Sequence, residues 1–133
     1  GYDANPYTKE LSQRILPKDD EACGVVDLTE DLGEVDKFNL VVCKDVLPYI
    51  PKEKLDKAIA NLARISDSYI LVSCSISDSQ SRIRHFCHDE QVLIQRFASN
   101  GFVLDKNRTR EIRISMKHQE YYLFYKKNDY GQN

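Results

Sequence analysis

The segment from Phe38 to Pro51 restricts the fold more than any other part of this chain. Leu40 to Cys43 is an apolar run too short for an amphipathic helix, which predicts a strand covered on both faces, as in a parallel sheet. The polar pair Lys44 and Asp45 then falls at the carboxyl end of this strand. Ligands of open α/β sheets bind outside the carboxyl ends of the strands, so the turn after Cys43 is the first candidate for a functional site.

Strand-like and helix-like segments alternate along the rest of the chain. Asn5 and Pro6 have the residue types of a helix N-cap and a first helical position, and Asn100-Gly101 is a typical helix stop. The expected strands are 2–3, 22–28, 40–43, 69–73 and 102–104. The expected helices are 6–16, 89–100 and one of about three to four turns after Pro51, which carries Leu55, Ile59, Leu62 and Ile65 at helical spacing. We expect an α/β fold with a mostly parallel sheet and helices on both faces.

The C-terminal region favours an antiparallel hairpin. Residues Arg110 to Met116 alternate in polarity, and Tyr121 to Tyr125 is aromatic and apolar. The polar segment 117–120 between them suits a turn. We therefore expect the sheet to close with two antiparallel strands.

Length and charge limit the class of protein. A chain of 133 residues accommodates one domain, which we place at residues 1–127 with a disordered tail at 128–133. The net charge of −2 gives no overall attraction to nucleic acid or to an anionic membrane. The chain also lacks an apolar run of about 20 residues and a signal-peptide pattern, so we expect a cytoplasmic protein.

The four cysteines are widely spaced, and three of them lie in or beside expected strands, at positions 23, 43 and 74. This favours free, packed thiols over a disulfide framework. The fourth belongs to His85-Phe-Cys-His88, whose nitrogen and sulfur atoms are suitable zinc ligands. Because a second ligand cluster is lacking, we expect no metal site and interpret this segment as a helix entry or a substrate-side loop.

In their order and their amino-acid sequences, several of these segments resemble the class I S-adenosylmethionine-dependent methyltransferases. Members of that family often have a strand followed by Asp-Val-Leu, an aromatic residue or histidine, and Ile-Pro before the next helix. The resemblance covers most of the chain, with the segment Phe38–Pro51 as its most specific part. The other matching segments are Gly1-Tyr-Asp3, Val26-Asp-Leu28, Ile70-Leu-Val-Ser73 and Asn100-Gly-Phe102.

The resemblance implies a role for six residues in binding the cofactor. Asp3 would accept hydrogen bonds from the ribose hydroxyls, and Asp27 and Leu28 would bracket the adenine. The turn of Cys43, Lys44 and Asp45 would lie beside the methionine part and the methyl group. Without the resemblance, Asp3 is better explained as an acid near a helix N-terminus, and Asp27 as a residue that caps a turn. With the resemblance, cofactor binding is favoured for Asp27, and the two explanations of Asp3 are equally good.

The family pattern also contains a segment that has no counterpart here. Family members begin with a strand and a Gly-rich loop that approaches the cofactor, whereas the five glycines of this chain include no G-x-G pair. Three explanations are open: the sequence is a fragment, its own strands close into a smaller sheet, or a second subunit completes the sheet as a homodimer.

Two functions follow from these observations. The first is S-adenosylmethionine-dependent methyl transfer to a small molecule or a sugar, with His85, His88 or Asp45 as the candidate general base. The second is a non-catalytic interaction or assembly module that has lost the cofactor loop. Both histidines are better explained as exposed loop residues, and Asp45 is equally well explained as the N-terminal anchor of the turn before Pro48.

A basic run near the C-terminus raises the question of nucleic-acid binding. Arg108, Arg110, Arg113 and Lys117 precede several tyrosines, a composition that suits phosphate pairing and base stacking. Arginines on the solvent-exposed face of an amphipathic strand explain the run equally well. With the negative net charge, we expect nucleic acid not to be the partner.

Overall fold

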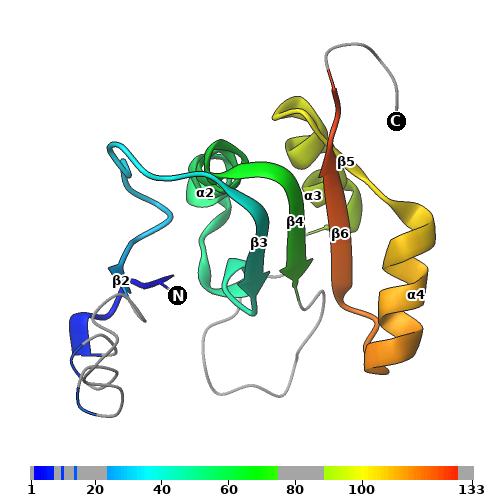
Figure 1. Ribbon diagram of the computed structural model, residues 1–133, viewed down its shortest axis with the longest axis horizontal. Helices are drawn as coiled ribbons and strands as arrows, with labels where there is room; N and C mark the ends of the chain where they lie inside the picture. The colour runs from blue at the N-terminus through cyan, green and yellow to red at the C-terminus, as the bar shows by residue number, and fades with distance from the viewer. Residues whose placement is uncertain (1, 8–9, 11–13, 15–23, 75–88, 129–133) are drawn as a thin grey trace.

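The computed structural model describes residues 2–7, 10, 14, 24–74 and 89–128. Four strands form a mixed sheet in the order β3-β4-β6-β5, and two short strands form a separate parallel pair (Figure 1). The strands of the large sheet are β3 (Phe38–Lys44), β4 (Ser66–Ser73), β5 (Phe102–Leu104) and β6 (Tyr121–Lys126). The pair consists of β1 (Tyr2–Asp3) and β2 (Gly24–Val25).

Two helices cover one face of the large sheet and enclose the core. They are α2 (Lys52–Ile65) and α3 (Glu90–Ser99), which contact each other and the strands. Leu55, Ile59 and Leu62 of α2 are buried at the predicted helical spacing. The Phe97 ring of α3 stacks on Phe124 of β6, with ring centroids 4.1 Å apart. Each helix thus presents one apolar stripe to the sheet, as expected from its sequence.

The helix boundaries follow the capping residues. The Asp89 carboxylate accepts hydrogen bonds from the backbone N–H groups of Gln91 and Val92 at the start of α3, and Gly101 follows the helix with a φ of +83°. Near the N-terminus, the Asn5 side chain accepts a hydrogen bond of 3.0 Å from the Tyr7 backbone N–H. The predicted N-cap at Asn5 and the predicted stop at Asn100-Gly101 are therefore confirmed.

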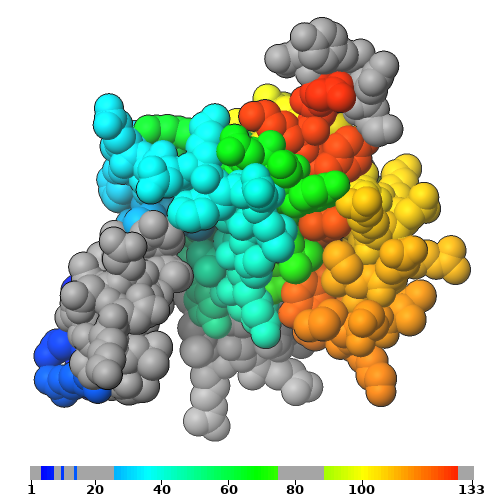
Figure 2. Space-filling model, viewed as in Figure 1, coloured from blue at the N-terminus to red at the C-terminus, as the bar shows by residue number. Residues whose placement is uncertain are grey.

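The predicted burial of β3 on both faces is wrong. β3 forms an edge of the four-stranded sheet, and Leu40 and Val42 are 52% and 56% exposed, whereas Cys43 is buried. Successive side chains of a strand point to opposite faces, so only the face with Cys43 is covered. The β3 surface (cyan) is open in Figure 2, on the side of the sheet away from α2 and α3.

The predicted strand from Arg110 to Met116 is also wrong, because these residues belong to the helix α4 (Lys106–Met116). The antiparallel partner of β6 is instead β5, with Val103 opposite Tyr125. Asp105 begins α4 by accepting a hydrogen bond from the Arg108 backbone N–H, and Lys117 ends it with a φ of +53°. The alternation of isoleucines in this segment does not reflect burial, since Ile114 is 67% exposed.

The described part of the chain contains no helix that is both long enough and apolar enough to span a membrane. The two cysteines that it includes, Cys43 and Cys74, are buried free thiols, as predicted. Cys23 and Cys87 lie outside the described residues.

Candidate cofactor site

The turn at the carboxyl end of β3 is held in an unusual backbone conformation. Asp45 has a φ of +54°, a region that costs a residue other than glycine of order 1–3 kcal/mol. Its backbone N–H donates to the Ser73 carbonyl (3.2 Å) and the Ser73 hydroxyl oxygen (2.9 Å), and that hydroxyl donates to Asp45 Oδ1 (2.9 Å). Three hydrogen bonds to the neighbouring strand β4 thus offset the strain and orient the carboxylate.

The side chains of Cys43 and Lys44, just before this turn, point to opposite faces of the sheet, as those of adjacent strand residues do. Cys43 is 3% exposed, and burial raises the pKa of its thiol to about 12, so the thiol stays neutral near pH 7. Lys44 is exposed and lies opposite Ser73 in the register of β3 and β4. Of the predicted Cys43–Asp45 triplet, two residues therefore present polar groups to solvent, and one belongs to the core.

The second predicted turn follows β2. Asp27 Oδ1 accepts hydrogen bonds from the Thr29 hydroxyl (2.7 Å) and the Thr29 backbone N–H (2.9 Å). These bonds stabilise the ionised form and lower the pKa of Asp27. Leu28 is half-buried and packs against the core. The carboxylate therefore caps a turn, and both of these bonds use the same oxygen.

Asn61 of α2 connects this turn to the large sheet. Its side chain is 4% exposed, and Nδ2 donates to the carbonyls of Leu28 and Glu30, both at 2.8 Å. A second link is the ion pair between Lys57 and Asp31. Sequence reasoning missed Asn61, although an amide beside the apolar stripe of α2 was a visible signal. Its acceptors lie more than 30 positions away, so the sequence did not indicate them.

The remaining predicted site residues are described only in part. The Asp3 backbone pairs with Val25 in the parallel β1–β2 ladder. His85 and His88 lie outside the described residues. Among the described residues, no group of three or more His, Cys, Asp or Glu side chains is placed to hold a metal ion.

The structure assigns the C-terminal tyrosines and arginines largely to internal contacts. The Arg113 guanidinium lies 4.7 Å from the centroid of the Tyr122 ring, and Tyr121 and Tyr122 are 6% and 1% exposed. Arg108 donates to the Tyr69 hydroxyl at 2.8 Å. Buried rings do not stack on nucleic-acid bases, so these contacts weaken the nucleic-acid interpretation.

These elements bring two polar turns to the carboxyl ends of parallel strands. One turn contains Asp27 and Leu28 after β2, and the other contains Asp45 after β3. An ionised carboxylate accepts hydrogen bonds from hydroxyl or amino groups, and Leu28 adds an apolar surface.

Comparisons with known proteins identify the fold. No family model and no curated protein sequence matches the chain, but many solved structures do. A magnesium protoporphyrin IX methyltransferase from Synechocystis with bound SAH has 18% sequence identity and a TM-score of 0.64; the match covers 95% of this chain and 61% of that one. A TehB-like SAM-dependent methyltransferase from Corynebacterium glutamicum has 17% identity and a TM-score of 0.66, with 96% and 67% covered.

A third matching structure is also that of a methyltransferase, with similarly low sequence identity. The N-methyltransferase NodS from Bradyrhizobium japonicum, in complex with SAH, has 14% identity and a TM-score of 0.64, with 96% of this chain and 65% of that one covered. The chain thus has the fold of the class I SAM-dependent methyltransferases. It spans 49% to 61% of the length of the Synechocystis enzyme in two of that enzyme's structures.

Proposed function

We propose that the protein transfers a methyl group from S-adenosylmethionine to an acceptor. The observation that carries this proposal is the strained Asp45 turn, which is held by Ser73 at the carboxyl end of a parallel strand pair. The fold supports it, since matching structures contain bound SAM or SAH. Strain of this kind is concentrated at functional sites, because the surrounding structure must maintain it.

The described residues suggest a division of roles toward the cofactor. The Asp27–Glu30 turn, fixed by Asn61, would hold the adenine between the Asp27 carboxylate and the Leu28 side chain. Asp3 would accept from the ribose hydroxyls. Lys44 and Asp45 would face the methionine part, and Cys43 would contribute by packing because its thiol is buried and neutral.

The bound cofactor would supply an activated methyl group on its sulfonium. The protein then needs to align the acceptor and, where the acceptor carries a proton, to remove it. Asp45 is the described candidate for that base, and His85 and His88 are the other candidates. A small molecule or a sugar is favoured over nucleic acid as the acceptor, because the chain has a net charge of −2.

Calorimetry with S-adenosylhomocysteine tests this function. We expect saturable binding that Asp27→Ala weakens by about tenfold, the equivalent of about 1.4 kcal/mol for a lost hydrogen bond to a charged group. Lys44→Ala is the comparison variant and should weaken binding less. The reverse ranking would contradict the assignment of the adenine turn, and an absence of binding to the chain would count against the function.

The second candidate function is a non-catalytic interaction module, and the open edge of β3 favours it. Phe38, Leu40 and Val42 are all more than 40% exposed on an edge strand, and exposed edges accept further strands. In this form a second copy of the chain would complete the sheet as a homodimer. Self-association without any binding of S-adenosylhomocysteine would favour this function over methyl transfer.

A further inference from the structure

A groove separates α4 from the start of α3 and has a volume of about 350 Å³. Leu104 of β5 and Ile114 of α4 provide its apolar walls. Its charged side chains are Glu90, Lys106, Arg110 and Arg113. The last three are spaced by four and three residues, so they lie on one face of α4.

The groove is locally cationic in a chain that is slightly acidic overall. Three positive side chains face a single carboxylate, whereas the whole sequence has a net charge of −2. A concave surface with a positive excess raises the local concentration of anions. The ordinary explanation for exposed basic residues is a solvated helix face, so the charge alone does not define a site.

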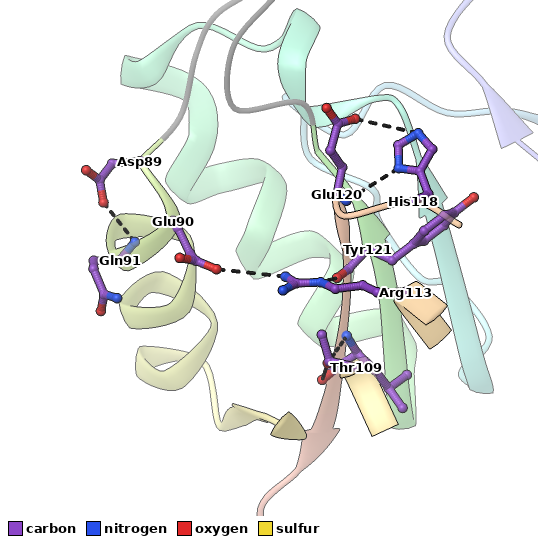
Figure 3. A network of polar contacts seen from close by, with 9 residues as sticks. Asp89, Glu90, Gln91, Thr109, Arg113, His118, Glu120 and Tyr121 are labelled. Atoms are coloured by element: carbon purple, nitrogen blue, oxygen red, sulfur yellow. Dashed lines mark hydrogen bonds and ion pairs between the residues drawn. The ribbon is translucent and has the colours of Figure 1, made fainter. Parts of the chain in front are cut away.

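Arg113 is held in place before any ligand arrives. Its Nε donates to the Tyr121 carbonyl at 2.9 Å, and its guanidinium lies over the Tyr122 ring. Nη2 is 3.8 Å from Glu90 Oε1. Figure 3 shows the side chain extending from α4 between Glu90 and the backbone of β6. A guanidinium fixed in this way loses little conformational entropy when it binds an anion.

Arg110 differs from the other arginines in the described part of the chain. Each of the others contacts a carboxylate, a carbonyl or a hydroxyl of the protein: Arg14, Arg64, Arg96, Arg108 and Arg113. Within the described residues, Arg110 has no such contact, and it lines the groove. Its fork of N–H donors is therefore available to an external oxyanion.

The groove and the Asp45 turn lie at the same end of the sheet. Lys44, Ser73 and Tyr121 are in register across the neighbouring strands β3, β4 and β6. Two strand spacings, about 10 Å, separate the backbones of Lys44 and Tyr121, and Arg113 binds the Tyr121 carbonyl. The Arg113 end of the groove is therefore close to the strand end that carries the Asp45 turn.

We propose that this groove binds an oxyanion, a carboxylate or phosphate group, and that the methyl acceptor is a small molecule carrying that group. Arg110 and Lys106 would hold the oxyanion beside the fixed Arg113. The identity of the ligand as the acceptor rests on the proposed methyltransferase function, whereas the oxyanion site does not.

NMR titration of the protein tests the groove directly. Inorganic phosphate and acetate are added in separate arms at constant ionic strength, and the Arg113 Nε–H signal and the α4 amide signals are followed. We expect saturable shifts, and the arm with the lower dissociation constant identifies the preferred group. The double variant Lys106→Gln/Arg110→Gln should raise that constant at least tenfold.

The matched control removes the same charge elsewhere. Lys52 on α2 and Lys126 at the other end of β6 are exposed and do not line the groove, so Lys52→Gln/Lys126→Gln should change the constant less than twofold. Linear shifts spread over many basic residues, or an equal loss in both double variants, would overturn the oxyanion site.

Binding of S-adenosylhomocysteine, measured on the same samples, separates this inference from the proposed function. Cofactor binding without a saturable anion response would overturn the groove and leave methyl transfer standing. An anion response without cofactor binding would retain the oxyanion site and overturn its assignment to a methyl acceptor.

Discussion

Single side chains determine how the candidate site is held, and Ser73 is the clearest example. Its hydroxyl accepts from the Asp45 backbone N–H and donates to the Asp45 carboxylate, both at 2.9 Å. Ser73 itself is 1% exposed. The left-handed conformation of Asp45 therefore depends on a buried side chain of the next strand. The sequence indicated the turn at Asp45 but not this partner, which lies 28 residues away.

Replacing Ser73 with alanine should release the Asp45 turn. We expect a loss of about 1–3 kcal/mol in the free energy of unfolding, because two partly buried hydrogen bonds disappear. Urea denaturation measures the change. Ser99→Ala is the control, since the Ser99 hydroxyl only donates within its own exposed helix turn, and it should change stability by less than about 0.5 kcal/mol. Equal effects of the two substitutions would contradict the role of Ser73.

The Cys43 thiol should make the protein less stable at alkaline pH. Burial raises its pKa from the ordinary value of 9.0 to about 12 in the folded state. Between these values the unfolded chain loses a proton that the folded chain keeps, so stability falls as pH rises above 9, by at most about 1.4 kcal/mol per pH unit. Unfolding measured from pH 8 to 10.5 should show a smaller slope for Cys43→Ala. An unchanged slope would show that the thiol titrates normally.

At the scale of elements, α4 covers the outer edge of β6 beyond the end of β5. The Thr109 hydroxyl oxygen accepts from the Leu123 backbone N–H at 3.0 Å, the Asp105 N–H donates to the Leu123 carbonyl at 2.8 Å, and Arg113 binds the Tyr121 carbonyl. Thr109 and Arg113 are four residues apart, so one helix face satisfies the backbone that a further strand would otherwise pair.

Thr109→Val tests how much the contacts of α4 with this edge contribute to the free energy of unfolding. Valine keeps the shape of threonine but leaves the buried Leu123 N–H without its acceptor, so we expect a loss of about 1–3 kcal/mol in unfolding free energy. Hydrogen exchange of the Leu123 amide should accelerate in parallel. Ser115→Ala, on an exposed position of the same helix, should have little effect on either measurement. A neutral Thr109→Val would show that α4 does not replace the missing strand contacts.

At the scale of the whole molecule, the main feature is the solvent-exposed face and edge of β3. The β1–β2 pair and the four-stranded sheet are separate. Asn61 and the Lys57–Asp31 ion pair connect helix α2 to the segment that follows β2. Leu40 and Val42 remain exposed beside an edge that has no described strand partner. Such a surface favours association through added strands or apolar contact.

Leu40→Lys should reduce self-association of the chain. We expect sedimentation velocity to show a concentration-dependent dimer for the unmodified chain and a shift toward monomer for the variant, because a charge on this surface opposes strand addition. Ile114→Lys is the control, since Ile114 is an even more exposed apolar residue and lies on α4. A chain that stays monomeric at every concentration, or equal effects of both variants, would contradict an interface at β3.

The sequence by itself determined the elements whose signals are local. The helices 52–65 and 90–99, the strands β3 to β6 and the Asp45 turn all follow from periodicity, caps and short apolar runs, because these patterns reflect contacts within a few residues. The class of fold followed from their order. Only the tertiary structure decided that β3 is an edge, that residues 106–116 form a helix, and that Ser73, Asn61 and Thr109 hold the site and the sheet edge. Each of these outcomes depends on partners 14 to 33 residues away or on the strand order, which local patterns do not specify.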